Sequence, residues 1–361
     1  MQLNLLTLPG DGIGPEVTRE AVRVLEHVAR KFGHTLHITE GLLGGIAIHK
    51  TGGPFPEETQ KLALAADATL MGAVGLPEFD NWPPEKRPER GLLGIRKLLG
   101  VFANLRPVVA YESLLESSPL KNDVVRGTDM LIVRELTGGL YYGTPRGIQV
   151  IDGERVVINT MVYRQSEIER VARMAFTLAR QRRKKVTSVD KSNVLENSQL
   201  WRDVVTRVGA DFPDVALDHI LVDNCAMQLI LNPRRFDVLV TENMFGDILS
   251  DEGAVLAGSI GMLPSASIGE RKPNGVWVGL YEPVHGSAPD IAGQNKANPL
   301  GAIGSVAAML SYSFGLAKEA KAVEDAIQKV LTSGRVTADL KPAGPPATTE
   351  EVGQAVCAAI G

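Results

Sequence analysis

The sequence is short of cysteine, of net charge and of long apolar runs, and each shortage excludes a class of protein. Two cysteines, Cys225 and Cys357, provide neither a disulfide framework nor a zinc site. A net charge of −4 over 361 residues gives no support to a nucleic-acid partner. No apolar run approaches the length of a bilayer span, so no membrane partner is expected.

Two nucleotide-binding signatures are also missing. The chain contains no G-x-x-x-x-G-K-[ST] loop, which counts against a P-loop enzyme. Residues 8–16 read LPGDGIGPE, with the spacing G-x-G-x-G in place of the Rossmann G-x-G-x-x-G, and no acidic residue is convincingly placed about twenty positions later. We predict a turn leading into a helix here, and not a dinucleotide fingerprint.

The overall composition is that of an ordinary globular protein. The chain is 44% hydrophobic and 22% charged, and its length suits two domains or one large α/β unit. It begins directly in the strand-like residues LNLLTLPG, with no basic leader or cleavage site. A reducing, cytoplasmic location is therefore expected.

Strand-like and helix-like segments alternate along the chain. The apolar residues 3–8 precede a helix that we expect to start near Pro15 and to stop at Gly33. A second helix is expected after a capping box of Ser166 and Glu169, and the buried strand 236–240 feeds a third helix. This order predicts a parallel or mixed sheet covered by helices. Loops are expected at 76–91 and 341–351, and no linker divides the chain, so a second domain would be an insertion into the first.

The third helix carries an acidic pair. Residues 242–253 read ENMFGDILSDEG, and Asp247 and Asp251 stand at i and i+4, one above the other on a helix. Such a pair usually belongs to a solvated face, but Phe245 and Leu249 make this segment too apolar for one. With Asp223, which follows another apolar run, the pair suits a hard cation such as Mg²⁺ or Mn²⁺.

Arginines close or interrupt apolar runs at 96, 106 and 134. A lone buried guanidinium is costly, so Arg96, Arg106 and Arg134 must each be paired. Internal ion pairs, for example with Glu135, are one explanation. Bidentate contacts to the carboxylates of a di-acid are the other.

Tyr141 and Lys191 are candidates for proton transfer, although either residue type more often packs or lies at the surface. Residues 282–293 read EPVHGSAPDIAG, where small residues let the backbone approach a ligand and Asp290 could accept hydrogen bonds from a ribose diol. Asn298 and Pro299 then suit the start of a helix. The ordinary alternative is a plain loop with a structural His285.

Seven segments resemble, in order and over nearly the whole chain, the metal-dependent β-decarboxylating dehydrogenases of the isocitrate/isopropylmalate dehydrogenase family. They are LPGDGIGPEV, FANLRP, RELTGGLYYG, VDKSNVLENSQLWRDVV, VDNCAMQL, TENMFGDILSDEGAVLAGSIGMLPSASIG and EPVHGSAPDIAGQNKANPLGAI. Cys225 departs from this pattern, because alanine is expected there.

The resemblance implies a non-Rossmann, two-domain α/β fold with a mixed sheet, around a cleft. The first, cofactor-binding domain would combine residues 1–101 and 258–361, and the second, for dimerisation and metal binding, would be 102–257. It also implies a homodimer in which each active site is shared between the subunits.

The resemblance also implies residue roles. Arg96, Arg106 and Arg134 would hold the substrate carboxylates, and Tyr141 would donate a proton. Asp247 and Asp251 would hold Mg²⁺ or Mn²⁺ together with Asp223 of the other subunit, which also supplies Lys191 as general base. NAD would be bound by a set drawn mainly from the glycine-rich segments: Ile13, Glu89, Asn193, Glu282, His285, Gly286, Ser287, Ala288, Asp290 and Asn298. The pair Asp290-Ile291 is typical of NAD use, since a carboxylate there repels a 2′-phosphate.

The expected substrate is a 2-hydroxy dicarboxylic acid. Leu92, Leu93 and Val194 would form an apolar wall beside Asp223 and the arginines, which favours 3-isopropylmalate, and no Ser/Asn pair is present for the third carboxylate of isocitrate. Leu92 and Leu93 could instead simply pack in the core. Alternatives are a sister enzyme for tartrate, D-malate or homoisocitrate, a metal-dependent lyase or phosphoryl-transfer enzyme, and a non-catalytic binding protein.

Overall fold

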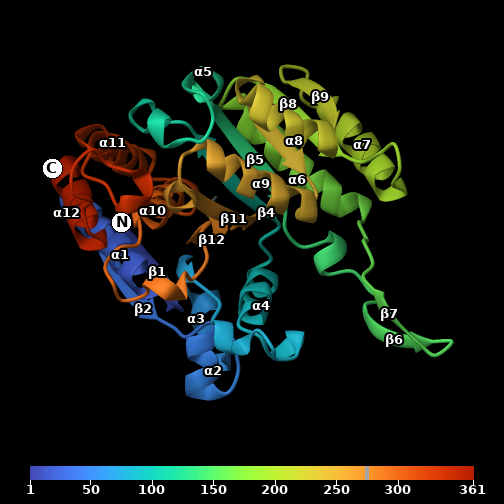
Figure 1. Ribbon diagram of the computed structural model, residues 1–361, viewed down its shortest axis with the longest axis horizontal. Coiled ribbons are helices and arrows are strands. Elements are labelled where there is room, and N and C mark those ends of the chain that lie inside the picture. Colours follow the sequence, from blue (N-terminus) through green and yellow to red (C-terminus); the bar gives the residue numbers. More distant parts are fainter. Residues whose placement is uncertain (273–275) are drawn as a thin grey trace. The chain divides into compact units, whose positions relative to one another are not determined.

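The computed structural model describes residues 1–272 and 276–361 (Figure 1). They form two compact units. Unit 1 comprises Met1–Val101, Tyr111–Pro119 and Ala257–Gly361, and unit 2 comprises Phe102–Ala110 and Leu120–Leu256. Each unit is an α/β structure with its own set of strands, and the predicted α/β class with a mixed sheet is confirmed.

Five strands of unit 1 lie in the order β2-β1-β3-β12-β11. Pairing is parallel from β2 to β12, whereas β11 runs antiparallel to β12. The strands are β1 (Gln2–Gly10), β2 (Thr35–Glu40), β3 (Ala68–Ala73), β11 (Pro264–Arg271) and β12 (Trp277–Pro283). Every residue of β3 is buried, as expected for a central strand covered on both faces.

The long helices of unit 1 pack around this sheet. α1, α10, α11 and α12 contact one another, and α1 and α10 also contact strands. The predicted ends of α1 are confirmed, with Pro15 in the first turn and Gly33 as a left-handed C-cap. The helices are α1 (Gly14–Phe32), α2 (Gly45–Thr51), α3 (Glu57–Ala65), α4 (Glu89–Leu99), α10 (Leu300–Tyr312), α11 (Ala317–Ser333) and α12 (Thr349–Ile360).

Unit 2 contains the strand order β4-β5-β10-β8-β9, antiparallel between β4 and β5 and parallel elsewhere. Its strands are β4 (Ala103–Val109), β5 (Asp129–Glu135), β8 (Lys185–Asp190), β9 (Ala216–Leu221) and β10 (Val238–Thr241), with a separate hairpin of β6 (Gly147–Ile151) and β7 (Glu154–Ile158). Its helices are α5 (Asn122–Val125), α6 (Gln165–Arg180), α7 (Glu196–Gly209), α8 (Val222–Leu231) and α9 (Asn243–Leu256).

Strand alternation decides where the central arginine of unit 2 points. The side chains of neighbouring residues in a strand point to opposite faces of the sheet, so those of Arg134 and Glu135 lie on different faces. Arg134 bonds Asn243 and Asp247 of α9, whereas Glu135 lies 3.8 Å from Arg170 of α6. Internal ion pairs of the arginines, considered above as one explanation, are therefore present, and Asp247 is the partner of Arg134 in place of the example Glu135.

One predicted helix start is wrong. The capping box expected at Ser166 and Glu169 is absent, because α6 begins two residues earlier than that box requires, with Arg164 as N-cap. There Glu167 Oε2 accepts the backbone N–H of Arg164 at 2.8 Å. Glu167 thus takes the place expected for Glu169, three residues after an N-cap that is not a usual capping residue type. Within the described residues, no helix combines the length and the apolar character needed to cross a bilayer.

Candidate functional site

The acidic pair lies on α9, which follows the buried strand β10 as predicted. Glu242, just before the helix, accepts the backbone N–H groups of Met244 at 3.0 Å and of Phe245 at 2.7 Å. Its carboxylate thus satisfies donors that the first helical turn leaves open. Burial raises the pKa of Glu242, against the lowering effect of those two bonds.

Two arginines meet the acidic pair. Arg134 of β5 is ion-paired with Asp247, and Nη1 of Arg106 lies 3.3 Å from Asp251 and 3.6 Å from Asp247. Both arginines are buried. The repulsion between two acids one helical turn apart is thus offset by guanidinium groups that converge on them from neighbouring strands.

Tyr141 joins the same group from the 3₁₀ turn η4 (Gly139–Tyr141). Its hydroxyl donates to Asp247 Oδ2 at 2.9 Å, and its ring lies 5.8 Å from the Arg134 guanidinium. Burial and the neighbouring Asp247 charge raise the pKa of Tyr141 to about 12. The pKa of Asp251 is also raised, chiefly by burial and in part by Asp247. This corner of unit 2 therefore holds a protonated phenol, two carboxylates and two guanidinium groups.

Lys191 and Asp223 form a second pair in unit 2. Lys191 Nζ donates to Asp223 Oδ1 at 2.6 Å, and this bond lowers the pKa of the Asp223 carboxyl. Asn193 and Val194 are exposed on the adjoining turn, where Val194 N–H bonds the Lys191 carbonyl. In the part of the chain that the structure describes, no three His, Cys, Asp or Glu side chains gather as a metal site. Asp223 of the same chain therefore does not complete the pair on α9.

The third predicted arginine belongs to unit 1. Arg96 of α4 pairs with Glu282 of β12, with Nη2 and Oε1 2.5 Å apart and both side chains buried. A predicted substrate residue and a predicted cofactor residue thus bond each other. Leu92 of the same helix packs against the core cluster around Leu6, Leu8 and Ile95, as the packing alternative required, while Leu93 is half-buried.

The glycine-rich turn at 10–14 is held by backbone contacts in unit 1. Ile13 N–H donates to the Ser287 carbonyl at 2.8 Å, and a Cβ on Gly12 would lie 2.0 Å from that oxygen. Buried Asp11 accepts the N–H groups of Gly45 and Ile46, each at 2.8 Å. The turn and the 285–291 loop therefore lie against each other, and only glycine fits at position 12.

The 285–291 loop carries the remaining predicted cofactor residues. His285 is buried, its pKa is lowered by burial, and its Nε2 has no hydrogen-bond partner within the described chain. Asp290 is exposed in the 3₁₀ turn η7 (Pro289–Ile291), next to Ala288 in a left-handed conformation. Gly286 is exposed. A Cβ added to Gly75 would lie 3.2 Å from Glu89 Oε1 and 3.7 Å from Ser287 Oγ, so both of these side chains lie close to Gly75.

Asn298 is largely committed to the fold. Its Oδ1 accepts the N–H of Leu300 at the start of α10, and its Nδ2 donates to Asp339 Oδ2 at 3.0 Å. The predicted cap is wrong by one residue, because Pro299 is the N-cap of α10 and the helix begins at Leu300. The Asn298 Nδ2 also donates to Met262 Sδ at 3.7 Å, so its amide group has two acceptors within the fold.

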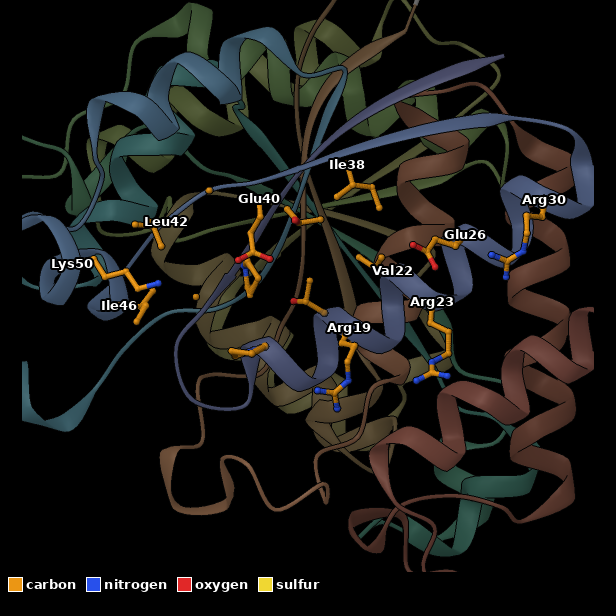
Figure 2. A pocket seen from close by; sticks show the side chains of 16 residues that line it. Arg19, Val22, Arg23, Glu26, Arg30, Ile38, Glu40, Leu42, Ile46 and Lys50 are labelled. Carbon is orange, nitrogen blue, oxygen red and sulfur yellow. The ribbon is translucent and has the colours of Figure 1, made fainter.

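A groove of about 900 Å³ also occurs in unit 1, away from these side chains. Figure 2 shows it between α1 and β2, lined along α1 by charged residues: Arg19, Arg23, Glu26 and Arg30. None of the predicted site residues lines it. Its size alone therefore does not identify it as the site.

The sequence interpretation missed Asn104, Asn243 and Ser250. All three are buried and bond the arginines: Asn243 bonds Arg134, while Asn104 and Ser250 bond Arg106. The only available signal was a polar residue inside an otherwise apolar segment, beside a predicted charge. That signal is too common to select a residue.

Comparison with known proteins defines the class to which this fold and site belong. A model of the isocitrate/isopropylmalate dehydrogenase family matches residues 4–356. The chain therefore belongs to that family. It is similar to the 3-isopropylmalate dehydrogenase of Geobacillus kaustophilus, at 59% identity over 94% of this chain and 90% of that protein. The corresponding enzyme of Aquifex aeolicus is 55% identical over 93% of this chain and 91% of its own.

Solved structures agree with this assignment. The isocitrate dehydrogenase of Methylococcus capsulatus superposes with a TM-score of 0.86 at 33% identity, covering 99% of both chains. A β-decarboxylating dehydrogenase of Thermococcus kodakarensis gives a TM-score of 0.79 at 35% identity, over 99% of this chain and 96% of that one.

Proposed function

We propose that the protein catalyses the NAD-dependent oxidative decarboxylation of 3-isopropylmalate to 4-methyl-2-oxopentanoate and CO₂, in leucine biosynthesis. The observation that carries the proposal is the convergence of Arg106, Arg134 and Tyr141 on the two carboxylates of α9. A dicarboxylic substrate needs cationic donors for its carboxylates, and its decarboxylation needs a proton donor beside them.

The residues present fit a divalent metal and NAD. Asp247 and Asp251 offer the hard oxygen ligands that Mg²⁺ or Mn²⁺ prefers, with Asp223 of a second subunit as the third. The Nε2 of His285, which has no hydrogen-bond partner among the described residues, and the exposed carboxylate of Asp290 suit a bound dinucleotide, the latter as acceptor for a ribose diol. When bound, the metal supplies positive charge near the substrate oxygens and NAD⁺ supplies the hydride acceptor.

The chain's own residues then divide the remaining work. Arg106 and Arg134 orient the substrate carboxylates by charge-assisted hydrogen bonds. Lys191 of the second subunit accepts the proton of the 2-hydroxyl as hydride leaves C2. After the bond between C3 and its carboxylate breaks and CO₂ leaves, Tyr141 donates its proton to C3, since its pKa of about 12 keeps the phenol protonated at neutral pH.

We also propose that the protein is a cytoplasmic homodimer. Large apolar side chains are exposed on α8 and α9, including Met227, Leu231 and Ile248 at 56%, 68% and 59%. Exposed apolar patches of this kind favour burial against another chain. The hairpin of β6 and β7 adds Val150 at 70% and Val157 at 64%. Pairing through these surfaces would let a second subunit contribute Lys191 and Asp223.

A substrate panel tests the function. With Mg²⁺ and NAD⁺, kcat/KM measured by NADH formation should be highest for 3-isopropylmalate among that acid, isocitrate, homoisocitrate, D-malate and tartrate. A higher value for any other acid would overturn the substrate assignment. If none of these acids supported NADH formation, a different class of reaction would be favoured. Sedimentation of the protein as a monomer at assay concentration would contradict the shared site.

A further inference from the structure

The guanidinium of Arg134 is held by a neutral side chain. Asn243 Oδ1 accepts from Nε at 2.9 Å and from Nη2 at 2.8 Å, and Asp247 accepts from Nη1. Arg134 and Asn243 are buried, at 3% and 1% exposure. One edge of the guanidinium therefore faces an amide oxygen and another faces a carboxylate.

Arg106 is held in a similar way. Its Nε donates to Asn104 Oδ1 at 2.8 Å, and its Nη1 donates to Ser250 Oγ at 2.6 Å and to Asp251 at 3.3 Å. Asn104 is fully buried and stands directly opposite Arg134 in the pairing of β4 with β5. Amide oxygens thus hold both arginines on the same face of this sheet.

The surrounding bonds set the orientation of the Asn243 amide. Its Nδ2 donates to the Gly138 carbonyl at 3.1 Å, so its Oδ1 must face Arg134. Its backbone N–H donates to the Tyr163 hydroxyl at 2.9 Å. A side chain fixed at both ends can hold the guanidinium in one place.

We propose that Asn243 and Asn104 are positioning residues that orient Arg134 and Arg106 toward the substrate's carboxylates with neutral oxygens, and so add no negative charge to that of Asp247 and Asp251. The inference rests on the proposed function. The two arginines and the two aspartates of α9 balance in charge, as two positive and two negative groups. A further carboxylate in place of either amide would add negative charge where a dianion must bind, while leaving the shape almost unchanged.

The test is the isosteric substitution Asn243→Asp, with Asn243→Ala and Asn104→Asp beside it. Calorimetry of 3-isopropylmalate binding to the dimer with Mg²⁺ and without NAD⁺ should show about 10- to 100-fold weaker binding for Asn243→Asp, the size expected for a like charge at close range. Asn243→Ala should weaken binding less, because it removes the holder without adding charge. KM for NAD⁺ should not change in any variant.

Asn122→Asp in α5 is the matched control, since it adds the same charge to a half-buried position of unit 2 outside the site. It should bind like the wild type. If Asn243→Asp fails to fold, as judged by circular dichroism, Asn104→Asp carries the same prediction.

Binding by Asn243→Asp as tight as in the wild type would overturn the inference, and so would equal losses in Asn243→Asp and Asn243→Ala. Failure of the proposed function is a different result, because the wild type itself would then neither bind nor oxidise 3-isopropylmalate.

Discussion

The two units bury arginine in different ways. In unit 1, Arg96 forms an ion pair with the carboxylate of Glu282, so its positive charge is neutralised within the fold. In unit 2, Arg106 and Arg134 bond amide oxygens on one edge and the aspartates of α9 on another. All three arginines therefore pair with a carboxylate, and in unit 2 a buried amide oxygen beside that carboxylate also fixes the orientation of each guanidinium.

The units also differ in what they offer a ligand. Unit 2 presents charged side chains, which suit a small acid and a metal ion. Unit 1 presents backbone and small residues at Gly12 and along 285–291, which suit a larger cofactor approached closely by the main chain. The predictions that follow test this contrast, and they begin with the largest effect.

Asp247→Asn should lower kcat on the order of 10³-fold or more, because it removes the charge of a proposed metal ligand that is also the acceptor of both Arg134 and Tyr141. The measurement is NADH formation at saturating 3-isopropylmalate over a range of Mg²⁺ concentrations, with circular dichroism to show that the fold is intact. Undiminished turnover would remove Asp247 from the metal site and weaken the account of unit 2.

Tyr141→Phe should lower kcat by about 10²- to 10⁴-fold, the usual contribution of a positioned acid. Because burial and Asp247 raise the pKa of Tyr141 to about 12, its phenol keeps its proton up to that pH. If the activity of the wild type falls between pH 7 and 10, the titration of another group must cause that fall. The residual activity of Tyr141→Phe should therefore fall over the same pH range. If the activity of Tyr141→Phe did not fall over this pH range, the raised pKa of Tyr141 would be contradicted.

Glu282→Gln should destabilise unit 1 by about 3–5 kcal/mol, because it leaves the buried charge of Arg96 without its carboxylate. Asn243→Ala, which removes a neutral holder from Arg134, should cost less, about 1–3 kcal/mol. Urea unfolding of both variants measures the difference directly. Equal losses would show that the two units do not treat arginine differently.

Asp290→Lys should have the smallest effect, a shift of about tenfold in the NADP⁺/NAD⁺ ratio of kcat/KM, because it removes a charge that repels a 2′-phosphate. Asp290 is exposed, so stability should not change. An unaltered ratio would exclude Asp290 from contact with the ribose.

Local features of the fold could be predicted from the sequence, because they depend on neighbouring residues. The helix from Pro15 to Gly33 and the acid-bearing helix after 236–240 were both predicted. The capping box at Ser166 and Glu169 failed because the N-cap of the helix is Arg164, which is not a residue type that signals a helix start.

The candidate site was predicted as a set of residue types, and its partners were not. Arg96 and Glu282 are separated by 186 residues, and Arg134 and Asn243 by 109, so no local pattern connects them. Glu135 carries the carboxylate nearest to Arg134 in sequence, but the alternation of side chains along a strand places the two on opposite faces of the sheet.

The sequence by itself determined the α/β class, the acidic pair, the arginines and the family resemblance, because periodicity and ordered motifs are written along the chain. Only the tertiary structure decided which oxygen meets each guanidinium, because strand register and helix packing bring together residues that are far apart in sequence. Those partners, an amide oxygen and a carboxylate for each arginine of unit 2, set the direction in which its guanidinium points.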